Sequence, residues 1–123
     1  MIAGRVNERH EAIIPVQMRG SARGFDVIID TGFQGSHLML PRVVIDALGL
    51  TRTGTVRIRL ANERVVRISS YTGEVAWHNG FKRVRVLESE NSYLASADLL
   101  AGSHIEIDMI PGGVVRIDAL AAV

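Results

Sequence analysis

Apolar and polar residues alternate with a period of two along most of this chain. That period is typical of β-strands in which every second side chain is buried. We expect the strands at residues 12–18 and 25–30 to form a hairpin around the glycine-rich turn at 20–24. Further strands are predicted at residues 38–40, 55–60, 64–77, 81–87, 93–95, 105–109 and 114–117.

Two short helices interrupt this pattern. Pro41 fits the first turn of a helix that continues through Leu48, and Gly49 fits its left-handed end. A helical turn is predicted at residues 98–101, where Gly102 follows. The pattern as a whole predicts an all-β fold with one or two short helices.

The strands at 55–60 and 64–68 form a long hairpin in this interpretation, with Ala61, Asn62 and Glu63 at its tip. Several arginines alternate with apolar residues along the hairpin. They are Arg57, Arg59, Arg64 and Arg67. We interpret them as the solvent-exposed face of a strand, and a preference for acidic substrates is the alternative.

The composition indicates a folded protein without an obvious nucleic-acid or membrane partner. The chain has 123 residues, enough for a single domain spanning residues 1–123 and too few for two lobes. Apolar residues make up 47% of it and charged residues 22%, without a low-complexity segment. The net charge of +1 gives no electrostatic reason to expect nucleic acid or an anionic membrane as partner.

The sequence lacks the residues and motifs of several common kinds of site, and it lacks membrane and secretory segments. Cysteine is absent, which excludes disulfides, thiolate metal sites and a cysteine nucleophile. No apolar run approaches the roughly 18 residues that span a bilayer, and the start has no apolar secretory core, so we expect a soluble cytoplasmic protein. Nucleotide-binding and zinc motifs are also absent, so no cofactor and no metal are predicted.

The strand at residues 25–30 ends in the most informative motif of the chain, Asp30, Thr31 and Gly32. The β-branched residues before Asp30 belong in a buried strand, where a carboxylate is costly unless hydrogen bonds or a partner charge stabilise it. A carboxylate in such a place is a candidate for chemistry. The same three residue types also form ordinary turns, so the tripeptide alone is weak evidence.

The context of the tripeptide is a stronger signal. Together with the loop at residues 33–41, it resembles the active-site loop of retropepsin-like aspartic proteases, especially their small bacterial members. The resemblance extends over residues 13–117. The hairpin at 55–68 stands in the place of the family's flap, and residues 94–100 resemble the segment that crosses behind the catalytic loop. This resemblance implies a closed β-barrel of one lobe that is completed as a homodimer.

Two positions depart from the family's pattern. Ser96 stands where the family usually has glycine, which raises the question of how closely the crossing segment approaches the catalytic loop. Phe33 stands where viral and pepsin-like members carry alanine or serine, and bacterial relatives tolerate phenylalanine there. Because Phe33 offers no hydroxyl donor, we expect catalytic carboxyls poised nearer neutral pH than in acid proteases. Activity only below about pH 4 would contradict this expectation.

The chemistry of this family needs two carboxyls, one ionised to deprotonate water and one protonated to polarise the peptide carbonyl. Like charges about 3 Å apart repel by roughly 5 kcal/mol at an effective dielectric near 20, or about four pKa units, so the pair shares one proton. The other aspartates lack the Thr-Gly that follows Asp30. They are Asp26, Asp46, Asp98, Asp108 and Asp118. The second carboxyl is therefore predicted to be Asp30 of a second copy, across a two-fold axis.

The resemblance also assigns roles to neighbouring residues. Thr31 would hydrogen-bond across the axis, and Gly32 would let backbone amides approach the carboxyls. The hairpin tip would close over an extended peptide substrate, although its residues are also ordinary turn formers. Residues 114–120 are apolar and alternating, as expected of a segment that enters a sheet shared by two chains.

Three functions fit the sequence to different degrees. We expect an aspartic endopeptidase in which Asp30 of each copy acts as acid or base. The alternative is a catalytically inactive dimer of the same fold that serves as a peptide-binding or assembly module. A metal-dependent hydrolase is disfavoured because the four histidines lack metal-ligand spacing. His37 lies near the active loop, but we interpret it as a surface or packed residue.

Overall fold

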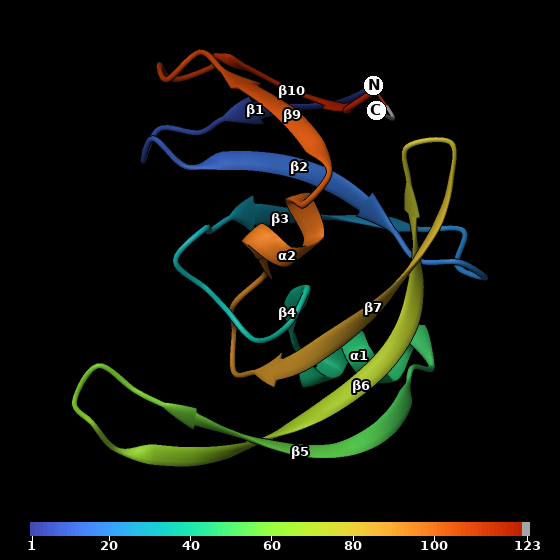
Figure 1. Ribbon diagram of the computed structural model, residues 1–123, viewed down its shortest axis with the longest axis vertical. Helices are drawn as coiled ribbons and strands as arrows, with labels where there is room; N and C mark the ends of the chain where they lie inside the picture. Colours follow the sequence, from blue (N-terminus) through green and yellow to red (C-terminus); the bar gives the residue numbers. More distant parts are fainter. Residues whose placement is uncertain (122–123) are drawn as a thin grey trace.

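The computed structural model describes residues 1–121 and consists mainly of β-strands with two short helices (Figure 1). The strands are β1 (Ile2–Val6), β2 (Ala12–Gln17), β3 (Gly24–Ile29), β4 (Leu38–Pro41), β5 (Thr51–Arg59), β6 (Val65–Trp77), β7 (Gly80–Ser89), β8 (Leu94–Ala95), β9 (Ser103–Ile107) and β10 (Val114–Ala119). The helices are α1 (Arg42–Leu48) and α2 (Ala97–Leu100). The predicted all-β class is confirmed, and β1 lies outside the predicted strands.

The strands form one sheet in the order β5-β6-β7-β4-β8-β3-β2-β1-β10-β9. The sheet curls around the core, with β2 and β3 on one side and β6 and β7 on the other (Figure 1). The expected barrel does not close, because β5 and β9 remain separate edges of the described sheet. β5 belongs to a hairpin at one end of the molecule and β9 lies at the opposite end, so they do not meet. An isolated bridge between Met18 and Val75 links the two halves of the curl.

At one end of the sheet, β10 lies between β1 and β9 and pairs with both. The sheet shared by two copies stays a prediction, and within the described chain β1 and β9 occupy both edges of β10. β1 takes the place beside it, and Gly4 lets β1 pass close to β2. A Cβ atom at Gly4 would lie 1.9 Å from the carbonyl oxygen of Ile13. The free edge at this end of the described sheet is β9.

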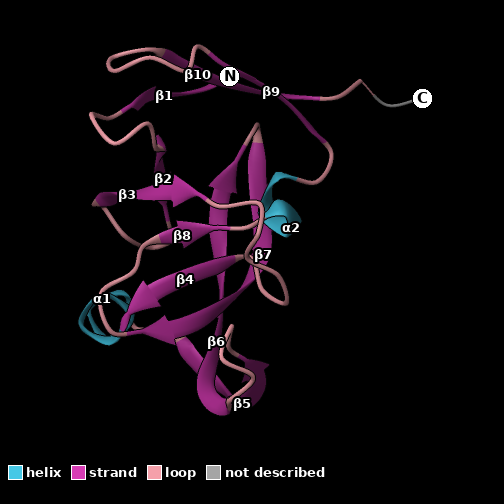
Figure 2. Ribbon diagram, turned by 90° about the vertical axis from the view of Figure 1, so that its left-hand side faces the viewer, coloured by secondary structure: helices cyan, strands magenta, loops and turns pink. Residues whose placement is uncertain are grey.

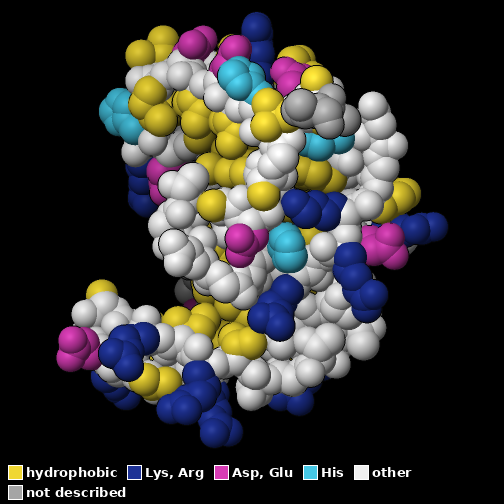
Figure 3. All heavy atoms as spheres, viewed as in Figure 1, with side chains coloured by type: hydrophobic (Ala, Val, Ile, Leu, Met, Phe, Trp, Pro, Cys, Tyr) yellow, Lys and Arg dark blue, Asp and Glu magenta, His cyan; other side chains and the backbone are white. Residues whose placement is uncertain are grey.

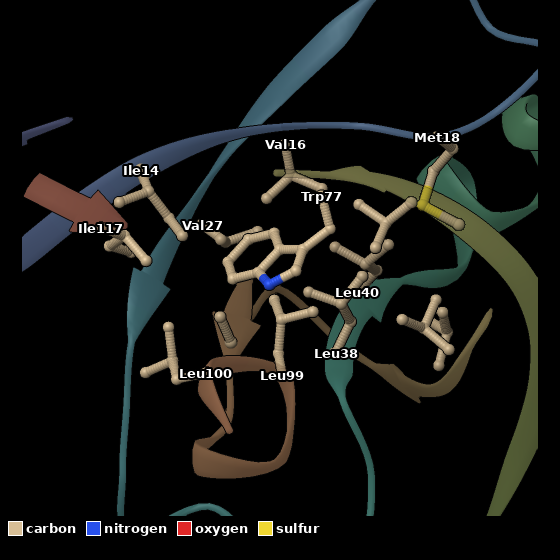
Figure 4. Close-up of a cluster of buried hydrophobic side chains, with 14 of the residues drawn as sticks. Ile14, Val16, Met18, Val27, Leu38, Leu40, Trp77, Leu99, Leu100 and Ile117 are labelled. Atoms are coloured by element: carbon tan, nitrogen blue, oxygen red, sulfur yellow. The ribbon is translucent and has the colours of Figure 1, made fainter. Parts of the chain in front are cut away.

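Trp77 of β6 lies in the centre of the buried cluster shown in Figure 4. Buried side chains from several strands and from α2 surround it, including Ile14, Val16, Val27, Leu38 and Leu99. Tyr71 of the same strand is also buried. Phe81 of β7, by contrast, is 54% exposed. The guanidinium of Arg19 lies over its ring, 4.7 Å from the centroid.

Both helices form where the pattern predicts them. α1 begins after Pro41 and ends at Gly49, whose φ of 65° is left-handed. α2 is only four residues long and is capped by Ser96, whose hydroxyl accepts hydrogen bonds from the backbone N–H groups of Asp98 and Leu99. Neither helix of the described chain is long and apolar enough to cross a membrane.

Candidate active site

Asp30 is the first residue after β3, and a crossing strand holds its backbone. β8 lies between β3 and β4, parallel to the former and antiparallel to the latter (Figure 2). The Asp30 N–H donates a hydrogen bond of 2.8 Å to the carbonyl oxygen of Ala95, in β8. The prediction that residues 94–100 cross behind the Asp30 loop agrees with this geometry.

The carboxylate of Asp30 is oriented by its own loop. The Gly32 N–H donates to Oδ1 of Asp30 at 3.0 Å, and the Phe33 N–H donates to the Asp30 carbonyl oxygen at 3.2 Å. A Cβ atom at Gly32 would lie 3.3 Å from Oδ1, so glycine leaves the amide free to approach. Asp30 is partly buried, whereas Thr31 and Gly32 are exposed. The carboxylate is thus less buried than the strand pattern predicts, because it lies beyond the end of the strand.

Ser96 is compatible with close approach of β8 to the Asp30 loop. It is fully buried, and its hydroxyl donates a hydrogen bond to the carbonyl oxygen of Ser36. Its N–H donates to the carbonyl oxygen of His37 at 3.0 Å. The hydroxyl of Ser36 in turn donates to the carbonyl oxygen of Arg85 at 2.6 Å. A serine at this position therefore stabilises the loop through a hydrogen bond and leaves β8 paired with β3.

The predicted flap corresponds to the hairpin of β5 and β6, which projects from the body on the same side as the Asp30 loop (Figure 1). Its tip residues Ala61, Asn62 and Glu63 are exposed. The Asn62 side chain accepts a hydrogen bond from the Arg64 N–H at 3.0 Å, and Glu63 has a φ of 66°. These contacts are those of a tight turn. The tip lies apart from the Asp30 loop (Figure 1).

A groove of about 460 Å³ separates the hairpin from the Asp30 loop. Figure 3 shows this hollow between the projecting hairpin and the body. Its lining residues come from the loop, β5 and β7: Gln34, Gly35, Val56, Arg57, Ile58, Arg59, Arg85 and Leu87. The sequence alone does not mark Arg85 as a site residue. It stands between two buried valines, as any solvent-exposed residue of a strand would.

His37 lies in the same loop, and its surroundings favour the neutral imidazole. Its Nδ1 atom accepts a hydrogen bond of 3.0 Å from the Arg85 N–H. Burial lowers the pKa of His37, the positive charges of Lys82 and Arg85 lower it further, and Asp98 opposes them. His37 thus packs against β7 as an acceptor, in agreement with its interpretation as a packed residue.

Within residues 1–121, no group of three His, Cys, Asp or Glu side chains lies in an arrangement that could hold a metal ion. The candidate chemistry of the described chain therefore rests on the carboxyl of Asp30 and the groove beside it.

Comparison with known proteins identifies the fold. No protein-family model matches the chain, and no curated protein matches its sequence. Among solved structures, it is similar to a retropepsin-like aspartic protease from Rickettsia conorii, with a TM-score of 0.64 and 19% sequence identity. The similarity covers 97% of this chain and 92% of that protein. The chain therefore has the fold of a retropepsin-like aspartic protease.

Proposed function

We propose that this chain is an aspartic endopeptidase that hydrolyses peptide bonds as a homodimer, with Asp30 of each copy in the catalytic pair. The observation that carries this proposal is the fixed position of Asp30. Its backbone is bonded to Ala95, its carboxylate to the Gly32 amide, and its loop borders a groove. A rigid scaffold that presents a carboxyl beside a groove is suited to acid–base catalysis.

A second copy supplies what one chain lacks. Acid–base hydrolysis of this type needs two carboxyls, and one chain offers a single Asp-Thr-Gly loop. Thr31 and Gly32 are exposed in the isolated chain. The turn between β9 and β10 lies on the same side (Figure 1) and carries Met109 and Ile110, which are 52% and 64% exposed. These exposed groups favour a two-fold contact on this side of the molecule.

In the dimer, the ionised Asp30 takes a proton from a water molecule, whose oxygen attacks the carbonyl carbon of the peptide bond. The protonated Asp30 of the other copy donates its proton to the carbonyl oxygen. The carboxyl that took the water proton then donates it to the leaving nitrogen, the other carboxylate takes a proton back from a hydroxyl of the tetrahedral intermediate, and the carbon–nitrogen bond breaks. Like-charge repulsion keeps one proton on the pair, so acid and base are present together.

The hairpin of β5 and β6 provides the other wall of the substrate site. An extended peptide in the groove would lie between the apolar side chains of Val56 and Ile58 and the loop at Gln34 and Gly35. Closing of the hairpin over the peptide would exclude water from the reacting bond. The tip residues Ala61, Asn62 and Glu63 would make this contact through the backbone of their turn.

The variant Asp30→Asn tests the proposal, because it keeps the shape of the side chain and removes its acid–base chemistry. Cleavage of denatured casein is measured for both proteins, and their size is measured by sedimentation. We expect the wild type to cleave, the variant to be inactive, and both to be dimers. Equal cleavage by the variant would refute the role of Asp30. Absence of cleavage by both, with equal peptide binding, would indicate a binding module instead.

A further inference from the structure

The groove beside the Asp30 loop has an unusual charge balance. Its lining residues Val56 and Ile58 are partly exposed and provide an apolar surface. The charged residues that line it are Arg57, Arg59 and Arg85, without a carboxylate among them. Positive charges that share a groove with apolar walls attract a negatively charged ligand.

Arg85 is the arginine whose backbone is fixed most firmly against the catalytic loop. Its neighbours Val84 and Val86 are buried in the core. Its N–H donates to Nδ1 of His37, and its carbonyl oxygen accepts from the His37 N–H at 3.1 Å and from the Ser36 hydroxyl. The position of the Arg85 backbone relative to the loop is therefore set by the fold, and its side chain starts at the edge of the groove.

The guanidinium of Arg85 is available to a ligand. Its side chain is exposed, and its Nη1 atom lies 3.5 Å from the carbonyl oxygen of Gly35, at the limit of a hydrogen bond. Within residues 1–121, Arg85 makes no ion pair with a carboxylate. The other cation near His37 is already used, since Lys82 donates to the carbonyl oxygens of Asp98 and Leu99.

We infer that Arg85 makes this groove selective for peptides that carry an aspartate or glutamate next to an apolar residue. This inference rests on the proposed peptidase function. The apolar side chain would contact Val56 and Ile58, and the carboxylate would pair with the guanidinium of Arg85. An arginine binds a carboxylate through two parallel hydrogen bonds, which fixes the orientation of the peptide as well as its position.

The test uses two peptides that are identical except for one position beside the scissile bond, which is glutamate in one and glutamine in the other. The peptides come from the casein cleavage sites that mass spectrometry identifies. We expect the wild type to cleave the glutamate peptide with a kcat/KM about tenfold higher, as for one charge-assisted contact. We expect Arg85→Gln to lose this preference. The charge reversal Arg85→Glu should favour a lysine peptide at the same position.

The matched control is Arg83→Gln. Arg83 lies on the same strand, is equally exposed, and lines a different surface hollow with Thr72 and Glu74. We expect this variant to keep the preference for glutamate, although it loses the same charge. Equal kcat/KM values for the two peptides in the wild type, or an equal loss in both variants, would overturn the inference.

A binding measurement separates this inference from the proposed function. The inactive variant Asp30→Asn is titrated with both peptides, labelled with a fluorophore, and the anisotropy is recorded. If casein is not cleaved, the pair is an extended peptide that carries either glutamate or glutamine next to a leucine, and tighter binding of the glutamate peptide still supports the role of Arg85. Equal binding of the two peptides by Asp30→Asn, when the wild type does cleave casein, refutes the role of Arg85 alone.

Discussion

The hydroxyl of Ser96 donates a hydrogen bond to the carbonyl oxygen of Ser36, a residue 60 positions earlier in the chain. The hydroxyl of Ser36 in turn donates a hydrogen bond to the carbonyl oxygen of Arg85. This series of hydrogen bonds joins the start of α2, the Asp30 loop and β7. The loop is thus supported by hydrogen bonds from the start of α2 and from β7.

Replacing Ser96 by alanine is expected to destabilise the fold. The change leaves the buried Ser36 carbonyl oxygen without this donor and removes the cap of α2. We expect the free energy of unfolding, measured with urea, to fall by about 2 to 4 kcal/mol. The control is Ser92→Ala, since Ser92 is exposed, and its effect should stay within about 0.5 kcal/mol. Similar effects of the two changes would contradict the bracing role of Ser96.

Gly32→Ala is expected to impair catalysis without unfolding the protein. The added Cβ would lie 3.3 Å from Oδ1 of Asp30, so the carboxylate has to shift away from the Gly32 amide. Since a small misplacement of a catalytic group is costly, we expect kcat/KM to fall by about tenfold or more. Gly80→Ala is the control, because a Cβ at Gly80 meets no atom within 4 Å. Full activity of Gly32→Ala would show that this amide contact is dispensable.

Subunit mixing tests whether both copies of Asp30 are needed. After equal amounts of wild type and Asp30→Asn exchange subunits, about a quarter of the dimers contain two intact carboxyls. We expect the activity per wild-type chain to fall to about half of its value in the unmixed enzyme. A sample assayed before exchange serves as the control. Activity per wild-type chain that is unchanged after exchange would indicate that each chain works alone.

His37 is expected to make stability depend on pH. Its pKa is lowered in the folded protein, mainly by burial and then by Lys82, so the unfolded chain binds a proton more readily. The stability contribution of neutral His37 is therefore complete above its unfolded pKa of 6.5 and is lost as the pH falls below that value. Urea unfolding at pH 7.5 and pH 5.5 measures this loss.

The variant His37→Asn provides the comparison. An asparagine carbonyl oxygen can accept the hydrogen bond from the Arg85 N–H, and it does not titrate. We expect the variant to lose less stability than the wild type between the two pH values. The same loss in both proteins would assign the pH dependence to other groups.

Much of the site was predictable because its main features are formed by residues that are neighbours in the sequence. The Asp30 loop needs an apolar strand, a carboxylate and a glycine in direct succession, and α1 needs Pro41 and Gly49 at its ends. Each of these features depends on local backbone preferences. The retropepsin-like fold of the chain agrees with the resemblance that the Asp30 loop suggested.

The features that sequence reasoning missed depend on residues far apart in the chain. β1 contains Ala3 and Gly4, which have low strand propensity, and it forms because β10 and β2 lie on either side. Arg83 and Arg85 follow the same alternation, and only the pairing of β4 with β7 brings Arg85 to the Asp30 loop. Closure of the barrel likewise depends on where β5 and β9 end, which local patterns do not determine.

The position of β10 has a consequence for how the molecule is made. β1 shares four residue pairs with β10 and only two with β2, so its main partner belongs to the other end of the chain. A ribosome synthesises β1 first, and β10 emerges only after every other strand. During translation, one edge of β1 therefore stays unpaired until β10 has been synthesised. We expect chaperones to bind this strand during that time.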